Sequence, residues 1–341
     1  MINPGHRYIL GNLPPPVGGV STFMRRHLSR LRASGEQFEA RDWVKMSAVE
    51  RVRWILFLAL FPRRLQLEFN AYETWAMGAV VLRPFRTHLT LRIHSGGPES
   101  RLSPGRQWIF RRFLGRVDHL ILVGPHVRDV LARAGFELPC EPEIQPAFLP
   151  PPPEDEPAIL QTYGDRGLSF LESHSPLLVL QGSDTFHDGV DLYGTDLALD
   201  VLADLRRTHP RAGLVVGSPS RGDAAFQAYC LGLDDRMAAE GIQDAVWILD
   251  GERELWPLIK RASVFLRPTT SDGDSIGVRE ALHFGVPVVA SDVVPRPDGV
   301  RLFASRDSED LIRAVRAALG ATGAEGAGAS HPVPQQSHRP R

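Results

Sequence analysis

The stretch that decides the fold is SVFLRPTTSDGDSIGVREALHFGVPVVAS, residues 263–291. It begins with an apolar run typical of a buried strand, passes through a polar loop and enters a helical stretch over Ile276–Phe284. A second apolar run, Pro287–Ala290, follows. Ser275 stands immediately before the helical stretch and is a favoured N-cap residue. The pattern therefore predicts a strand, a loop, a helix and a second strand of a parallel sheet.

The same alternation extends to both sides of this stretch. In the second half, strands are expected at Pro176–Gln181, Gly213–Gly217, Ala245–Asp250 and Ser263–Arg267, and helices at Leu197–Thr208, Glu252–Arg261 and Ser308–Leu319. In the first half, strands are expected at Arg7–Leu13, Thr87–His94 and Asp118–Gly124, and helices at Val20–Leu31, Pro104–Leu114 and Pro125–Ala134. Such alternation predicts doubly wound α/β domains with helices on both faces of parallel sheets.

A proline-rich segment divides the chain. Residues 147–157 contain four consecutive prolines, which resist both helix and sheet interior. We expect an N-terminal domain over 1–146, a linker over 147–157 and a C-terminal domain over 158–319. The remainder, 320–341, has the composition of a disordered tail. Ligands bind at the carboxyl ends of parallel strands and between domains, so the chemistry is expected in a cleft that both domains face.

The composition is that of a soluble globular protein. Of 341 residues, 43% are hydrophobic and 23% are charged, which excludes a disordered chain, a collagen-like repeat and a disulfide-rich mini-protein. Cys140 and Cys230 fit neither a disulfide framework nor a zinc motif. The sequence shows no secretory signal and no apolar run of the about 18–20 residues that span a bilayer. The cytoplasm is therefore the expected location.

Charge is distributed unevenly along the chain. Residues 1–150 carry 21 basic and 12 acidic residues, whereas the rest carries 18 and 28. A basic first half could face anionic lipid, a phosphorylated acceptor or nucleic acid, or be a solvated surface. The apolar run Trp54–Phe61 has arginines on both sides. It fits either a buried core helix or a helix that lies on an anionic membrane.

Two carboxylates lie on either side of the predicted helix N-terminus. Asp272 is in the loop, and Glu280 is two turns inside the helix. The backbone N–H groups and the dipole at a helix N-terminus suit a phosphate or diphosphate. Carboxylates placed in this way could accept hydrogen bonds from hydroxyls at both ends of a sugar nucleotide. Glu280 also lies among apolar residues, where an unpaired carboxylate is costly to bury.

The segment from Asp272-Gly273 through Glu280-Ala281, followed by Gly285-Val-Pro-Val-Val-Ala-Ser291, resembles the E-x7-E region of the GT-B glycosyltransferases of family 4, also called glycosyltransferase group 1. A looser similarity covers about residues 7–319. The resemblance implies a GT-B fold, in which two Rossmann-like domains face a central cleft. It implies that the first domain binds the acceptor and the second binds the nucleotide-sugar donor.

The resemblance also implies roles for individual residues. Glu280 would bond the ribose hydroxyls, and Asp272, in place of the family's first Glu, would contact hydroxyls of the transferred sugar. His94 would lie near the donor sugar, although it could equally be an ordinary strand-end histidine. The other donor-binding residues, which would surround the base, the diphosphate or the sugar, are Gly18, Gly19, Gly251, Glu252, Asp274, Ser275, Ile276 and Gly277. The pair Gly18-Gly19 also fits a plain turn.

The sequence departs from the family where the diphosphate would bind. The family usually carries an Arg and a Lys near the first strand and helix of the second domain, but residues 181–194 contain neither. Tyr193 stands where the Lys is expected and is counted with the donor-binding residues. Arg267 is the preferred replacement, because it ends a strand on the cleft side; Arg279 and His187 are alternatives. Arg267 could equally form a structural ion pair with a nearby aspartate.

We therefore expect a retaining hexosyltransferase that uses a nucleotide-diphosphate sugar and a hydroxyl of a glycan or lipid-linked acceptor, in cell-surface polysaccharide biosynthesis. No obvious covalent nucleophile is present, so attack assisted by the donor's own phosphate is expected. No cofactor and no required metal are expected, although Asp272 and Asp274 could together hold Mg²⁺. The basic cluster of Arg106, Arg111, Arg112 and Arg116 favours a phosphate-bearing acceptor or peripheral contact with the inner face of an anionic membrane.

Two alternatives remain open. The missing Arg/Lys pair and the shortened first carboxylate also fit a catalytically impaired GT-B protein that acts as a nucleotide-binding or helper subunit. Nucleotide-sugar 2-epimerases share the architecture. A nucleic-acid partner is not expected, because the basic residues lack interleaved aromatics in a recognisable module.

Overall fold

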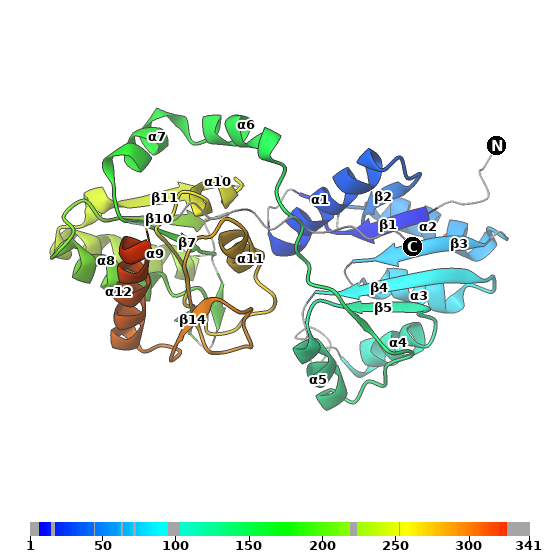
Figure 1. The fold of residues 1–341 in the computed structure, drawn as a ribbon. Coiled ribbons are helices and arrows are strands. Elements are labelled where there is room, and N and C mark those ends of the chain that lie inside the picture. The colour runs from blue at the N-terminus through cyan, green and yellow to red at the C-terminus, as the bar shows by residue number, and fades with distance from the viewer. Residues whose placement is uncertain are drawn as a thin grey trace.

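The structure is a computed structural model, and it describes residues 7–14, 18–43, 45–62, 64–70, 73–94, 103–183, 185–187, 189–218, 224–251 and 253–325. These residues form two α/β units that lie side by side (Figure 1). Each unit is built on a six-stranded sheet, and each has its own hydrophobic core.

The first unit contains a parallel sheet in the order β2-β1-β3-β4-β5-β6. Its strands are β1 (Arg7–Gly11), β2 (Glu39–Asp42), β3 (Leu65–Phe69), β4 (Thr87–Ile93), β5 (His119–Leu122) and β6 (Glu143–Ile144). Its helices are α1 (Gly19–Ala33), α2 (Ala48–Leu60), α3 (Thr74–Leu82), α4 (Pro104–Leu114) and α5 (Pro125–Arg133). Every strand pair in this sheet is parallel, as the alternation of strands and helices predicts.

The second unit contains a parallel sheet in the order β11-β10-β7-β12-β13-β14. Its strands are β7 (Leu177–Gln181), β10 (Gly213–Ser218), β11 (Val246–Asp250), β12 (Val264–Arg267), β13 (Val288–Ser291) and β14 (Val300–Phe303). Its helices are α8 (Thr195–Arg206), α9 (Ala224–Glu240), α10 (Trp256–Ile259), α11 (Ile276–His283) and α12 (Ser308–Glu325), with a 3₁₀ turn at Gln243–Ala245. A small antiparallel hairpin joins β8 (Phe186–His187) and β9 (Val190–Asp191).

The segment that crosses between the units is shown in green in Figure 1 and ends in helices. A 3₁₀ turn at Pro153–Asp155 leads into α6 (Glu156–Gln161) and then α7 (Gly164–Ser173). Helix α6 thus begins inside the segment 147–157 that was expected to be a linker. Between the two helices, Tyr163 packs against Trp247 and donates a hydrogen bond from its hydroxyl to the Glu254 carbonyl at 2.6 Å. These helices are therefore packed on the second unit.

The sequence pattern missed several elements that carry weak periodicity. It missed strand β2, whose sequence EARD contains little apolar surface, and strand β3, whose run is interrupted by Glu68. It also missed α3 and α9. The helix predicted over Glu252–Arg261 is the single turn α10. Helix α12 continues six residues beyond Leu319, so the structure corrects the expected start of the tail at 320; residues 326–341 lie outside the described part of the chain.

In helix α2 the run Trp54–Phe61 has one buried side, as expected of a core helix, and an apolar side that is exposed. Trp54 and Leu58 are buried against the core. Val49, Val52, Leu56 and Leu60 form a stripe on the opposite side and are 51% to 72% exposed. No helix among the described residues is both long and apolar enough to cross a membrane.

Candidate active site

A cavity of about 70 Å³ lies between the two units, at the carboxyl ends of their sheets. The first unit contributes the start of α1, and the second contributes the ends of β7, β10 and β11 together with α10 and α11. The lining residues are Gly18, Gly19, Thr22, Arg26, Gln181, Gly217, Ser218, Leu249, Gly251, Arg253, Glu254, Leu255, Trp256, Ile259, Ile276, Gly277 and Glu280. The volume is well below the about 300 Å³ at which small-molecule pockets begin. The cavity is therefore closed to a nucleotide in this conformation.

The start of α11 is arranged as the sequence predicts. Ser275 is the N-cap, and its side chain accepts a hydrogen bond from the Val278 backbone N–H at 3.4 Å. Gly277 has no room for a side chain, because an added Cβ would lie 2.7 Å from Cζ of Phe265. A Cβ on Gly19 would lie 3.9 Å from Cδ1 of Ile276, so the glycine loop of the first unit adjoins this helix N-terminus.

Glu280 lies on α11 and lines the cavity, and its side chain is 6% exposed. Its Oε1 accepts a hydrogen bond from Nη2 of Arg26 at 2.5 Å, across the boundary between the units. Burial raises the pKa of Glu280, and the opposing charges of Arg26 and then Arg25 lower it. The carboxylate that the resemblance assigns to ribose is thus held here by an arginine of the other unit.

A second acidic residue of the cavity is also paired across the boundary. Glu254 forms an ion pair with Arg25 and lies 3.6 Å from Nη2 of Arg26. Neither this carboxylate nor the two arginines is predicted from the sequence. The adjacent pair Arg25-Arg26 in a helix that follows a glycine loop is a signal that could have indicated them.

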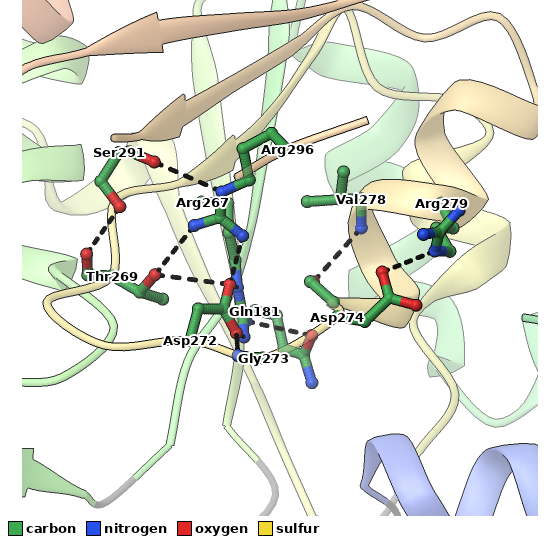
Figure 2. A network of polar contacts seen from close by, with 11 residues as sticks. Gln181, Arg267, Thr269, Asp272, Gly273, Asp274, Val278, Arg279, Ser291 and Arg296 are labelled. Atoms are coloured by element: carbon green, nitrogen blue, oxygen red, sulfur yellow. Dashed lines mark hydrogen bonds and ion pairs between the residues drawn. The ribbon is translucent and has the colours of Figure 1, made fainter. Parts of the chain in front are cut away.

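Asp272 forms ion pairs with two buried arginine side chains, Arg267 and Arg296 (Figure 2). Arg267 donates two hydrogen bonds to its carboxylate, at 2.7 and 2.9 Å, and Arg296 donates a third at 2.5 Å. Burial opposes ionisation of this carboxylate, but Arg267 and then Arg296 hold the pKa of Asp272 below its ordinary value. The carboxylate is therefore saturated by ion pairs. Of the two roles left open for Arg267, the structure shows the ion pair.

Tyr193 belongs to the same cluster. The guanidinium of Arg267 lies 4.9 Å from the centre of the Tyr193 ring, and its Nη1 donates to Oε1 of Gln181 at 3.3 Å. Gln181 also lines the cavity. The position where the family's Lys is expected thus holds an aromatic ring that packs on a buried arginine.

Asp274 turns away from Asp272 toward α11, as Figure 2 shows. Its Oδ1 accepts a hydrogen bond from Nε of Arg279 at 2.6 Å, and its Oδ2 is buried without a partner in the described part of the chain. Burial raises the pKa of Asp274, against the charge of Arg279. The two aspartates therefore do not form a shared cation site. Among the described residues, no group of three or more His, Cys, Asp and Glu side chains could hold a metal ion.

His94 lies outside the cavity, in a polar cluster of the first unit. Its ring packs edge-on against Phe23 of α1, with centroids 5.1 Å apart. The guanidinium of Arg92 lies over the same ring, 4.9 Å from its centroid. Desolvation, followed by the charges of Arg92 and His27, lowers the pKa of His94 to about 3. The imidazole is therefore neutral near pH 7, and its Nε2 is buried without a partner among the described residues.

A buried carboxylate anchors the same cluster. Glu68 lies on β3 and receives hydrogen bonds from Arg7 at 2.7 Å and Asn70 at 3.1 Å, and it lies 2.9 Å from Nε2 of His27. Burial raises the pKa of Glu68, but these partners, His27 first, lower it to about 2.

The predicted site residues thus fall into separate groups. Gly18, Gly19, Gly251, Ile276, Gly277 and Glu280 line the cavity. Arg267, Asp272 and Tyr193 form the cluster that reaches the cavity through Gln181. Ser275 and Asp274 stabilise the start of α11 and its first turn, and His94 lies apart. Glu252 and the side chain of His187 lie outside the described residues.

The chain is similar in sequence and in fold to known proteins. Residues 188–320 match the family model of the glycosyl transferases group 1. HepE of Anabaena, in a structure with UDP and glucose, superposes with a TM-score of 0.64 over 94% of this chain and 91% of that chain, at 14% identity. The fold is GT-B. A sucrose-phosphate synthase from Thermosynechococcus elongatus has a TM-score of 0.59 at 15% identity, over 93% of this chain and 90% of that chain.

A UDP-forming α,α-trehalose-phosphate synthase from Burkholderia xenovorans has a TM-score of 0.63 at 14% identity and covers 92% of this chain and 91% of that chain. No curated protein matches the chain in sequence. The two parallel sheets and their flanking helices confirm the predicted GT-B architecture. The match to the glycosyl transferases group 1 model supports the conclusion that the chain is a glycosyltransferase.

Proposed function

We propose that the chain is a retaining glycosyltransferase of family 4 that moves a hexose from a nucleotide-diphosphate sugar to a hydroxyl of a glycan or lipid-linked acceptor. One observation carries the proposal. A buried carboxylate, Glu280, stands beside a helix N-terminus in a cavity that both units line at the carboxyl ends of their sheets. A ligand held there has hydroxyls facing the carboxylate and an anion facing the helix.

In this proposal the second unit holds the donor. Glu280 bonds the ribose hydroxyls, and the backbone N–H groups at Ile276 and Gly277 face the diphosphate. The wall formed by Gly251 and Leu255 receives the base. Uridine is the first base to test, because HepE has been solved with UDP and with UDP-glucose.

Retention is what the family resemblance implies, and the groups available favour a route without a covalent intermediate. Glu280 and Glu254, which line the cavity, and Asp272 in the adjoining cluster are each paired with arginine, so none of these three is a free nucleophile. The acceptor oxygen then forms a bond to the anomeric carbon on the face from which the diphosphate departs. The anomeric C–O bond to phosphate breaks, and the acceptor proton passes to the departing phosphate oxygen. Positioning and stabilisation of the leaving charge supply the rate enhancement, and no cofactor or metal is required.

The first unit is proposed to bind the acceptor at the inner face of a membrane, in cell-surface polysaccharide assembly. The exposed stripe on α2 lies next to exposed Arg53, and Leu82 at the end of α3 is 79% exposed. Helix α3 packs against both α2 and α4. The exposed arginines of α4 and the turn that follows it are Arg106, Arg111, Arg112 and Arg116. Aliphatic side chains beside cationic ones suit the surface of an anionic bilayer.

The proposal is tested by measuring thermal shift and slow donor hydrolysis over a panel of nucleotide sugars, with wild type and Glu280→Ala. A ligand that binds only the folded state raises the melting temperature by mass action. One donor should stabilise wild type and be hydrolysed by it. In Glu280→Ala, the affinity for that donor and its turnover should each fall at least tenfold. Glu309→Ala, which removes an exposed glutamate of α12, should behave as wild type.

Two results would contradict this proposal. Full turnover in Glu280→Ala would remove the role assigned to the carboxylate. If no nucleotide sugar stabilises the folded wild type, the chain is better described as a GT-B protein that has lost donor chemistry and serves as a helper subunit. Conversion of a free nucleotide sugar without an acceptor would instead indicate a 2-epimerase.

A further inference from the structure

A diphosphate needs cations close to it. The segment in which the family's cations are expected supplies none to the cavity. Residues 181–194 supply Gln181 to the cavity wall, and Tyr193 packs on Arg267 behind it. Arg267 itself is committed to Asp272. A departing diphosphate in a closed site requires positive charge close by, so another element has to supply it.

We propose that Arg26, on helix α1 of the first unit, is the residue that binds the donor diphosphate, and that Glu280 holds it in place until the ribose takes that carboxylate. The inference rests on the proposed function, since it concerns the same cavity and the same donor. The positive charge would then come from the first unit, whereas the second unit holds the rest of the donor.

The position of Arg26 supports this assignment. Its side chain is 3% exposed and lines the cavity. Nη2 bonds Glu280 at 2.5 Å, and Nη1 donates to the Leu149 carbonyl at 2.9 Å. Nε is buried without a partner among the described residues. A guanidinium normally satisfies its donors when buried, so this one has capacity for a further acceptor.

The size of the cavity requires that Arg26 moves. With the Arg26–Glu280 pair in place, the space is about 70 Å³, too small for a nucleotide. Bound ribose would use the carboxylate of Glu280, and the buried guanidinium would then keep only the more distant Glu254, at 3.6 Å, which leaves part of its charge uncompensated at a cost in free energy. A diphosphate in the same cavity removes that cost, because its oxygens accept the two parallel hydrogen bonds that a guanidinium presents.

The path that Arg26 would take is short. Helix α1 starts at Gly19, which adjoins Ile276 at the N-terminus of α11, where the diphosphate is proposed to lie. Arg26 lies two turns further along the same face as Gly19 and Thr22, which also line the cavity. A change of its side-chain rotamer, or a small rotation of the units, is therefore the movement required.

The test compares ligands that differ only in phosphate. Binding of uridine, UMP and UDP is measured by titration calorimetry at constant ionic strength for wild type, Arg26→Ala and Arg26→Lys; the adenine or guanine series replaces them if the donor panel selects that base. Arg26→Ala should weaken UDP by at least tenfold, while uridine binds as well as to wild type or better, because no guanidinium has to leave Glu280. Arg26→Lys should recover part of the UDP affinity and of the turnover.

Arg30→Ala is the matched control, since it removes an exposed arginine one turn along the same helix. It should leave all three affinities and the turnover unchanged. UDP affinity that is equal in Arg26→Ala and wild type would overturn the inference while leaving the proposed function intact. Equal weakening of uridine and UDP would also overturn it, because Arg26 would then be a structural partner of Glu280. Wild type that binds none of these ligands would refute the proposed function and the inference with it.

Discussion

At the scale of single residues, charge pairing decides what each carboxylate of the site can do. Asp272 accepts hydrogen bonds from Arg267 and Arg296, and all three side chains are at most 7% exposed. It is one methylene shorter than the glutamate of the related motif. The short side chain and its two buried arginines make Asp272 a centre that fixes the loop before α11, rather than a free ligand for sugar hydroxyls.

Replacing Asp272 with Asn should therefore unfold the second unit at lower denaturant concentration. Removal of one partner of a buried ion pair leaves uncompensated charge and costs about 3–5 kcal/mol. Urea unfolding followed by circular dichroism measures this change. Glu141→Gln, which breaks the exposed pair with Arg128, should cost about 1 kcal/mol or less. Equal effects of the two substitutions would show that the cluster around Asp272 is not the anchor described here.

The sequence predicted single residues where a local pattern places them. Ser275 as an N-cap and Glu280 within α11 follow from the order of strand, loop and helix over residues 263–291. Arg26 could not be found in this way, because its partner Glu280 is 254 positions away in the chain. Arg296 follows β13 in a loop without periodicity, and only the folded chain brings it to Asp272. Pairing across the fold leaves no signal in local spacing.

At the scale of secondary-structure elements, the same limit applies to strands and helices. Buried strands such as β7 and β12 are continuous apolar runs and were predicted within a few residues. Strand β2 lies at the edge of its sheet with half-exposed charged residues, so its sequence resembles a loop. Helix α2 was recognised as apolar, but hydrophobicity alone could not show that one apolar side faces the core and the other faces outward.

The exposed side of α2 leads to a prediction about membrane binding. Wild type should sediment with vesicles of phosphatidylglycerol mixed with phosphatidylcholine, and much less with phosphatidylcholine alone. Val52→Glu combined with Leu56→Glu should reduce binding to the mixed vesicles by at least tenfold, since each aliphatic side chain transferred from water contributes about 1.5–3 kcal/mol. The melting temperature should hardly change, because both side chains are more than half exposed.

Leu231→Glu provides the control for α2, since Leu231 is 65% exposed on α9 of the other unit. Its binding to vesicles should equal that of wild type. If the α2 double variant still binds anionic vesicles as wild type does, the stripe is not the membrane contact, and the arginines of α4 become the candidates to test.

At the scale of the whole molecule, stability in acid depends on groups in both units. The pKa of Glu68 falls from 4.5 to about 2 in the folded first unit, so its contribution is present above pH 4.5 and is lost as the pH falls toward 2. The pKa of Asp272 in the second unit is also lowered, so its contribution to stability is likewise lost as the pH falls below the ordinary value of 3.8. Burial raises the pKa values of Asp274 and Glu280, so these two groups act in the opposite direction and partly offset the loss.

His94 shifts the onset of this loss to higher pH. Its pKa is lowered from 6.5 to about 3, so the unfolded chain takes up a proton below pH 6.5 that the folded chain does not. The free energy of unfolding should therefore decrease by up to about 1.4 kcal/mol per pH unit as the pH falls below 6.5. Urea unfolding at pH 7, 6 and 5 measures this slope. His94→Gln should flatten it, whereas His119→Gln, which replaces a side chain that is 46% exposed, should not. An unchanged slope in His94→Gln would show that the ring is free to take up a proton in the folded protein, and the polar cluster around it would not hold the imidazole neutral as described here.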